Sequence, residues 1–284
     1  MRVERCHSID AVQIATIEYG ESSNADVSLL FIHGWLDNAA SFETVMSELH
    51  ALQPSLHLCA IDLPGHGLSS HKDSHNFYPF HDYIDDVYRL LAKLSPNRLV
   101  LVGHSLGALI ASCYSAAFPE QISGLVQIEG NGPLAEEPHL SVSRLRDGVL
   151  SRQRIRRKPV RTLTSPQQAI QRRARVNDID SDLIAPVVYR GIRQCDSGWQ
   201  WRHDSKLQSQ SLYRMSFQHA DTFRQHVLCS QLIILGEQGF ESLQSISIDA
   251  RASTQIEWIH GGHHCHLQSP SRVSSLIFGL VNKI

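Results

Sequence analysis

The sequence predicts an α/β protein built on a mostly parallel β-sheet with helices on both faces. Short, wholly apolar runs alternate with segments of helical periodicity along most of the chain, which is typical of parallel strands joined by helical crossovers. The alternation stops once, between about residues 131 and 227, and then resumes. One apolar run also ends in Gly-x-Ser-x-Gly directly before a helical segment. We therefore expect an α/β core, residues 1–130 and 228–284, with residues 131–227 inserted as helices.

The first part of the core is expected to contain six strands. Residues 4–19 alternate loosely between apolar and polar side chains, which favours an antiparallel pair at the edge of the sheet. Four apolar runs follow, at residues 28–32, 57–61, 99–102 and 122–128. Apolar residues recur with helical spacing between these runs, at residues 41–52, 79–94 and 108–118.

The inserted region differs from the core in composition. Its apolar runs are short, and residues 144–175 contain eleven Lys or Arg residues but a single acid, Asp147. Helices are expected there at residues 140–153, 166–176, 181–190 and 213–226. After the insertion, strands are expected at residues 232–235 and 255–259, and helices at residues 242–250 and 271–281. The sheet thus reaches eight strands, with the insertion placed after the sixth.

The composition favours an ordinary globular protein. The chain has 284 residues, of which 42% are hydrophobic and 19% charged, and its net charge of −2 gives no general attraction for nucleic acid or an acidic membrane surface. Its six cysteines lie far apart, which indicates reduced thiols rather than a disulfide framework. We find no signal-type segment and no apolar run of membrane-spanning length. We expect a cytoplasmic protein with no cofactor and no nucleic-acid or membrane partner; its oligomeric state stays open.

The segment Gly103-His104-Ser105-Leu106-Gly107 joins the apolar run 99–102 to the helical segment 108–118. A strand that turns sharply into a helix, with serine at the turn, is the nucleophile-elbow pattern. Glycine is needed on both sides, because side chains two residues before and after the serine would collide in this strained turn. The serine hydroxyl then stands clear of the sheet, beside the first amides of the helix. We therefore interpret Ser105 as a nucleophile.

Several motifs, taken together, resemble the α/β-hydrolase superfamily. In chain order they are His33-Gly34-Trp35, Asp62-x-Pro-Gly-His-Gly-x-Ser69, Gly103-His-Ser-x-Gly107 and Gly262-His263. The stretches from Phe31 to Asn38 and from Gly261 to Leu267 are similar to the serine hydrolase-like branch, which carries a helical cap. The resemblance spans nearly the whole chain. It implies an α/β-hydrolase fold, a helical cap formed by the insertion, and hydrolysis by a Ser-His-acid triad.

His263 is the expected base of that triad. A serine hydroxyl is a poor nucleophile until a base takes its proton, and histidine suits this task near neutral pH. His263 follows Gly262 directly after the last expected strand, where the resemblance places the base. His264 and His266 are its rivals, and His266 is expected to pack nearby. The local crowding of histidines also suggests a metal site, but adjacent histidines point apart on a regular backbone, so we expect no metal there.

The acid of the triad has two candidates. The resemblance implies an acid shortly after the strand 232–235, three residues beyond a glycine, but that position holds Gly239. Glu129, at the end of the strand 122–128, is similar to a minority arrangement seen in haloalkane dehalogenases. Glu237 lies nearer the usual position but out of register. Either carboxylate could orient His263 and stabilise its charged form. We favour Glu129 and keep Glu237 as the alternative.

The resemblance also implies an oxyanion hole formed by two main-chain amides, those of Trp35 and Leu106. We expect the side chains of Trp35 and His104 to line the substrate pocket. Asp37 and Asn38 are expected to be loop and helix-capping residues rather than catalysts.

We therefore expect a serine hydrolase that acts on a small-molecule acyl substrate, with carboxylic esters as the leading class. Thioester hydrolysis and carbon–carbon cleavage of diketones stay open, because the same triad serves all three. A non-catalytic ligand- or partner-binding role stays open too, because the usual acid is missing. The basic residues 144–175 could steer anionic substrates, but we favour the interpretation that they are solvated helix faces.

Overall fold

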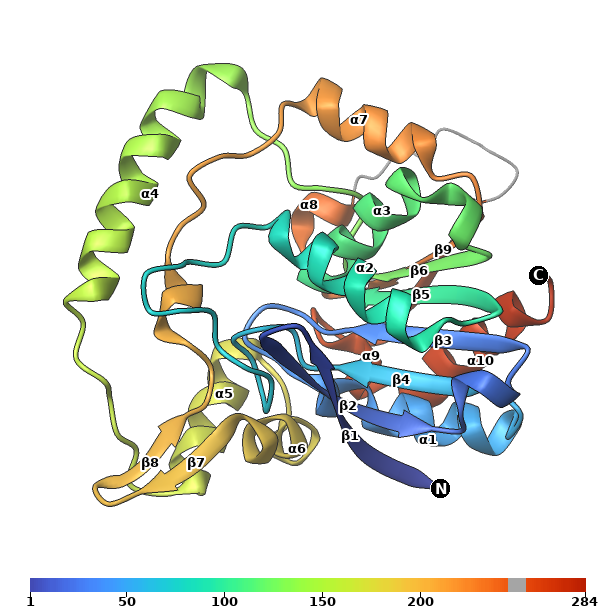
Figure 1. Cartoon of the computed structure of the whole chain (residues 1–284), viewed down its shortest axis with the longest axis horizontal. Coiled ribbons are helices and arrows are strands. Elements are labelled where there is room, and N and C mark those ends of the chain that lie inside the picture. The colour runs from blue at the N-terminus through green and yellow to red at the C-terminus, as the bar shows by residue number, and fades with distance from the viewer. Residues whose placement is uncertain (245–253) are drawn as a thin grey trace.

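The computed structural model describes residues 1–244 and 254–284 and contains an eight-stranded sheet with helices on both faces (Figure 1). The strands are β1 (Arg2–Ile9), β2 (Val12–Tyr19), β3 (Val27–Ile32), β4 (His57–Ile61), β5 (Arg98–His104), β6 (Gly124–Ile128), β9 (Ser230–Gly236) and β10 (Thr254–Ile259). Their order in the sheet is β1-β2-β4-β3-β5-β6-β9-β10. β2 pairs antiparallel with β1 and with β4, and the other neighbours are parallel. The expected fold class is confirmed.

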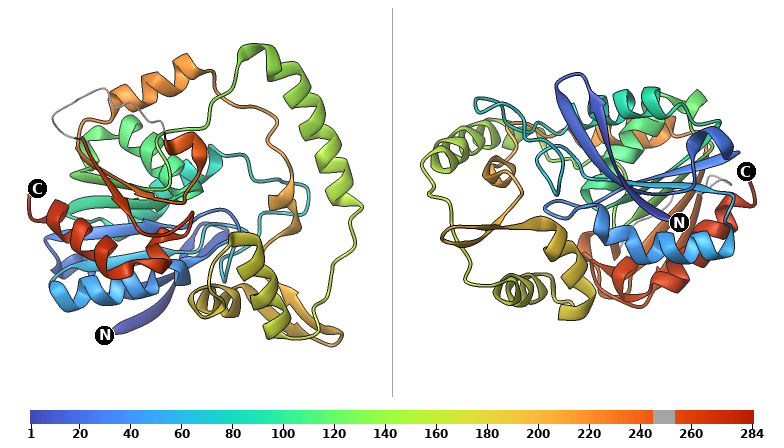
Figure 2. Two further views of the ribbon diagram at one scale, coloured as in Figure 1. Left: turned by 180° about the vertical axis from the view of Figure 1, so that it is seen from behind. Right: turned by 60° about the horizontal axis from the view of Figure 1, so that its bottom comes forward.

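Two apolar clusters, one on each face, hold the sheet between its helices. Successive side chains of a strand point to opposite faces, so Leu29 and Phe31 enter one cluster and Leu30 and Ile32 the other. α1 (Glu43–Leu52) and α10 (Pro270–Val281) pack together on the first face. α2 (Asp82–Leu94) and α3 (Leu106–Ala117) cover the second face (Figure 2).

The segment between β6 and β9 forms the long excursion beside the sheet in Figure 1. Its helices lie at the expected places, with ends shifted by a few residues: α4 (Ser141–Arg156), α5 (Pro166–Asn177), α6 (Ser181–Gly191) and α7 (Phe217–His226). α7 returns to pack against α3. A hairpin of β7 (Ile192–Cys195) and β8 (Gly198–Trp201) was not predicted from the sequence, because strands of four residues are too short to show a clear alternating pattern.

The last part of the core follows the expected order. Of the helix expected at residues 242–250, the described part is α8 (Glu241–Gln244), and residues 245–250 lie outside the described residues. A single helical turn, α9 (Cys265–Gln268), follows β10 and precedes α10. None of the helices in the described chain combines the length and the apolar character needed to cross a membrane.

The junction of β3, β5 and α3 leaves no room for side chains at two glycines. A Cβ on Gly103 would lie 2.3 Å from the carbonyl oxygen of Gly107, and a Cβ on Gly107 would lie 1.9 Å from the carbonyl oxygen of Ile32. Both distances are far inside van der Waals contact with main-chain atoms that cannot move independently. Glycine at these positions therefore lets α3 begin directly against the sheet, and this contact fixes the turn that carries Ser105.

We expect Gly107→Ala to lower the free energy of unfolding by at least about 2 kcal/mol, because its methyl group must push β3 and α3 apart. Gly279→Ala is the matched control. Nothing lies within 4 Å of a Cβ at Gly279, and removing glycine from the interior of α10 should raise stability by about 0.5–1 kcal/mol. Guanidinium denaturation measures both effects. An unchanged unfolding midpoint for Gly107→Ala would contradict the packing described.

Candidate active site

Ser105 lies in a strained turn between β5 and α3. Its φ is 50° and its ψ −115°, a conformation that costs a non-glycine residue about 1–3 kcal/mol. Hydrogen bonds hold it from both sides: the N–H of Ser105 donates to the carbonyl of Ile128 at 2.9 Å, and the N–H of Ala108 donates to the carbonyl of Ser105 at 2.9 Å. The turn thus fixes the half-buried serine at the carboxyl edge of the parallel strands.

Glu129 directly follows β6, the strand beside β5, and has a positive φ of 52°. Its side chain is 1% exposed. The carboxylate accepts hydrogen bonds from the N–H of Gly236 at 2.8 Å and from the N–H of Phe240 at 3.1 Å. Main-chain donors of this kind compensate a buried carboxylate for the water it has lost. They also aim the carboxylate along the edge of the sheet, toward the loop that follows β10.

His263 lies in that loop, and its Nδ1 is 3.2 Å from Oε2 of Glu129. The ring of Phe240 covers it, with ring centroids 4.0 Å apart. The carbonyl of His263 accepts a hydrogen bond from Nε2 of His104 at 2.8 Å. Because His104 directly precedes Ser105, this bond ties the loop of His263 to the serine turn. With Nδ1 facing the carboxylate, Nε2 of His263 is the nitrogen left to act on a hydroxyl.

The structure brings Glu129 to His263 but does not bring Glu237 there. The Glu237 side chain is 59% exposed, and its ion-pair contact is with Nδ1 of His260, at 3.9 Å. Gly239 explains how Glu129 fits: a Cβ at Gly239 would lie 2.2 Å from Oε1 and 2.5 Å from Oε2 of Glu129. The carboxylate of Glu129 therefore fills the space that a side chain at position 239 would enter.

The expectation that His104 lines the substrate pocket was wrong. His104 is 1% exposed, and its ring packs against those of His263 and His266, with centroids 4.8 and 4.2 Å away. Burial and the neighbouring histidines lower the pKa of His104 well below its usual value, and burial lowers the pKa of His266 to about 3. Both rings are thus neutral near pH 7. His104 supports His263 from inside the protein and does not face a substrate.

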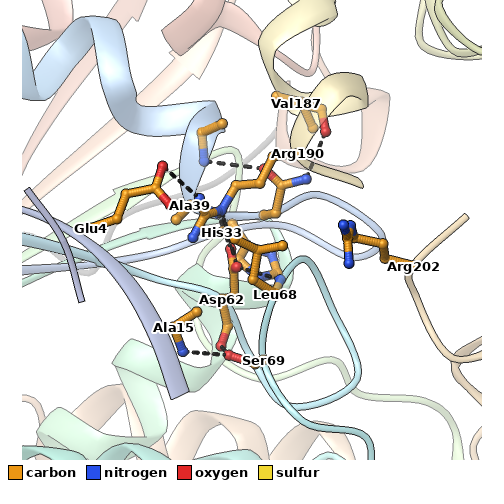
Figure 3. Close-up of polar contacts among 12 residues, drawn as sticks. Glu4, Ala15, His33, Ala39, Asp62, Leu68, Ser69, Val187, Arg190 and Arg202 are labelled. Atoms are coloured by element: carbon orange, nitrogen blue, oxygen red, sulfur yellow. Dashed lines mark hydrogen bonds and ion pairs between the residues drawn. The ribbon is translucent and has the colours of Figure 1, made fainter. Parts of the chain in front are cut away.

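Asp62 holds the loop of residues 33–39, which carries the main-chain amide of Trp35. Its two carboxylate oxygens accept hydrogen bonds from the N–H groups of Ala39 and Leu68, each at 2.7 Å. Arg190 of α6 donates to the same oxygens at 3.1 and 3.0 Å and also pairs with Glu4 (Figure 3). Asp62 is fully buried, so this pair joins the inserted segment to the core where no water competes.

Two further contacts join the same loop to the insertion. Nδ2 of Asn38 donates to the carbonyl of Val187 in α6 at 2.7 Å. The indole of Trp35, which is 52% exposed, donates to the carbonyl of Leu207 at 3.0 Å. Within the described chain, the main-chain N–H of Trp35 makes no hydrogen bond. The N–H of Leu106, in the first turn of α3, has no acceptor within its helix. Both amides are therefore available to a ligand.

Asp37, in the same loop, is the centre of a second buried network. Its Oδ2 lies 3.1 Å from Nε2 of His264 and 3.7 Å from Nδ1 of His104, and its Oδ1 pairs with Arg173 of α5. Burial opposes ionisation, but His264 and Arg173 hold the pKa of Asp37 well below its usual range. One atom each of Asp37, His104 and His264 lies within 4.8 Å of the others, a spacing that a metal ion could bridge. Oδ1 of Asp37 is already paired with the guanidinium group of Arg173.

Sequence reasoning missed the part that Asp37 and Asp62 play, because it treated Asp37 as a loop or capping residue and Asp62 only as one member of a motif. Their cationic partners, Arg173 and Arg190, lie 136 and 128 residues further along the chain. The only signal available was the general rule that a buried acid needs a cation. No pattern in the arginine-rich insertion shows which arginines turn inward.

Comparisons with known proteins agree with the fold. A family model for the alpha/beta hydrolase fold matches residues 27–238. A serine hydrolase-like protein of Danio rerio is 27% identical over 263 residues, which cover 88% of this chain and 79% of that protein. The solved structure of a hypothetical protein from Pseudomonas aeruginosa PAO1 is 28% identical, with a TM-score of 0.85 over 98% of both chains. The thioesterase domain from the curacin biosynthetic pathway shares the fold, with 21% identity and a TM-score of 0.85 over 98% of this chain and 99% of that domain.

Proposed function

Because the chain belongs to the alpha/beta hydrolase fold family, we propose that it is a serine hydrolase that cleaves a carboxylic ester through an acyl-enzyme intermediate. One observation carries the proposal: the buried carboxylate of Glu129 contacts Nδ1 of His263, beside the strained turn of Ser105. A histidine oriented by a buried acid, next to a serine at a strand–helix turn, is the arrangement that activates a hydroxyl.

In the proposed reaction, Ser105 attacks the ester carbonyl while Nε2 of His263 takes its proton. Glu129 holds the Nδ1–H of His263 and stabilises the imidazolium that forms. The amides of Trp35 and Leu106 stabilise the oxyanion of the tetrahedral intermediate. His263 then gives the proton to the departing alcohol, which leaves the acyl group on Ser105. Water, deprotonated by the same histidine, releases the acid and restores the serine.

In this proposal residues 131–227 act as the cap over the substrate pocket. The contacts of Arg173 and the Val187 carbonyl with the loop of residues 33–39, and of Arg190 with Asp62, support it, because they join the insertion to the loop that would supply the Trp35 amide. The half-exposed indole of Trp35, bonded to the carbonyl of Leu207, would line the pocket under the cap.

Thioesters and the carbon–carbon bond of diketones are alternative substrates for the same triad, and the likeness to a thioesterase domain speaks only for the shared fold. A non-catalytic ligand- or partner-binding role is the alternative of another class. This alternative stayed open because the usual acid position holds a glycine, Gly239. The position of Glu129 weakens it, because the Glu129 carboxylate occupies the space beside Gly239 and contacts His263.

We expect Ser105→Ala to lower the turnover of a 4-nitrophenyl ester by about a thousandfold or more while leaving the fold intact, because it removes the nucleophile and little volume. A fluorophosphonate probe should label the unchanged protein at Ser105, as identified by mass spectrometry, and should not label the variant. Turnover in Ser105→Ala close to that of the unchanged protein would contradict the mechanism. If the probe fails to label the wild-type protein, the non-catalytic alternative is favoured.

We expect Glu129→Gln to lower kcat by at least about a hundredfold more than Glu237→Gln, because only Glu129 orients His263 and balances its charge. Glutamine keeps the size of the side chain and loses the charge. Glu237→Gln is the matched control, since it makes the same chemical change at an exposed position close by. Steady-state kinetics on one ester decides between the two acids. A larger loss in Glu237→Gln would show that Glu237 is the acid.

A further inference from the structure

A cavity of about 360 Å³ opens between α4 and the loop that precedes α2. Arg152 and Arg156 line it from α4, and Lys72, Phe77 and Asp82 line it from the core. None of the residues proposed for the triad or the oxyanion hole is among its lining residues. The cavity is thus separate from the candidate active site. Figure 1 shows that α4 stands apart from the sheet. The cavity lies where α4 faces the loop before α2.

The arginines of this cavity are held in place by an aromatic ring. The guanidinium carbon of Arg152 lies 4.5 Å from the centroid of Phe77, and that of Arg156 lies 5.1 Å from it. The side chain of Phe77 is itself buried, with 6% exposure. Cation–π contacts with one buried ring hold both guanidinium groups at the same cavity. They leave the N–H donors of the two groups free to bind a ligand.

The positive charge of these arginines is not balanced by the protein. The charge of Lys72 is paired within the protein, because its Nζ lies 2.6 Å from Oδ2 of Asp82. Within residues 1–244 and 254–284, no ion pair joins Arg152 or Arg156 to a carboxylate, and Nε of Arg152 is buried without a hydrogen-bond partner. Like charges one helical turn apart repel each other. In keeping with this, burial and Arg156 lower the pKa of Arg152.

We propose that this cavity binds the phosphate group of a phosphate monoester through Arg152 and Arg156. Near neutral pH such a group carries a charge of about −1.5 to −2, which matches two unpaired arginines. Its oxygens suit the planar, forked donors of guanidinium groups. The volume of about 360 Å³ exceeds that of a phosphate and leaves room for part of the molecule that carries it.

The basic residues 144–175 also allow a simpler interpretation, in which they form solvated helix faces without a specific site. Arg154 and Arg157 belong to the same run of positive charge, but neither of them lines the cavity. If residues 144–175 attract anions only through their total charge, removing two charges at Arg152 and Arg156 weakens phosphate binding as much as removing two at Arg154 and Arg157. If the cavity is a specific site, only the loss of Arg152 and Arg156 weakens phosphate binding.

The test is calorimetric titration of the purified protein with inorganic phosphate, at low ionic strength and neutral pH. We expect saturable binding to one site, weakened by at least about tenfold in the double variant Arg152→Gln/Arg156→Gln. The matched control, Arg154→Gln/Arg157→Gln, removes the same charge and should bind phosphate like the unchanged protein. Circular dichroism checks that α4 remains folded in both variants.

Two results would overturn the proposal: no saturable phosphate binding by the unchanged protein, or equal weakening in the two double variants. Glycerol phosphate and vesicles containing phosphatidic acid distinguish the source of the phosphate. If only glycerol phosphate competes with inorganic phosphate, the site binds a soluble monoester. If the protein binds the vesicles and the variant Arg152→Gln/Arg156→Gln does not, the site binds a lipid headgroup. The readout is binding and not turnover, so the result stands whether or not Ser105 is a nucleophile.

Discussion

The buried carboxylate of Glu129 is the group on which the candidate site depends. A charge removed from water needs donors. Glu129 finds them in the main chain of Gly236, the last residue of the neighbouring strand β9, and of Phe240, four residues later. The carboxylate thereby reaches from the end of β6 to the end of β9, where the family resemblance implied an acid. Gly239 leaves it the necessary room. The acid comes from a different strand, yet it meets His263 in the space where a side chain at position 239 would stand.

Charge pairs between the core and the insertion support the other side of the site. Asp37 lies in the loop that carries the Trp35 amide, and Asp62, directly after β4, holds that loop. Their partners, Arg173 and Arg190, come from α5 and α6. Removing one member of a buried ion pair typically costs about 3–5 kcal/mol, so these contacts strongly fix the insertion against the loop. α5 and α6 are therefore part of the framework of the proposed oxyanion hole, whereas α4 meets the core at the arginine-lined cavity.

The sequence predicted the fold well, because its evidence is local: each buried strand is an apolar run, and Ser105 is marked by its two glycines. The hairpin of β7 and β8 was missed because its strands are short. Two acids remained possible for His263, since a one-dimensional pattern cannot show that Glu129 turns inward and Glu237 outward. His104 was misplaced for a similar reason. Its neighbours, His263 and His266, come from the far end of the chain, and only the fold shows that they bury it.

The central claim, that Glu129 supplies the acid in the space in front of Gly239, is tested most directly by moving the carboxylate. Glu129→Ala empties that space, and Gly239→Asp puts a carboxylate into it from a backbone that is not left-handed. We expect each single variant to hydrolyse a model ester poorly, the second because two carboxylates collide. The double variant should recover at least about tenfold in kcat over Glu129→Ala. A double variant no faster than Glu129→Ala, or a Glu129→Ala variant with undiminished kcat, would contradict the claim.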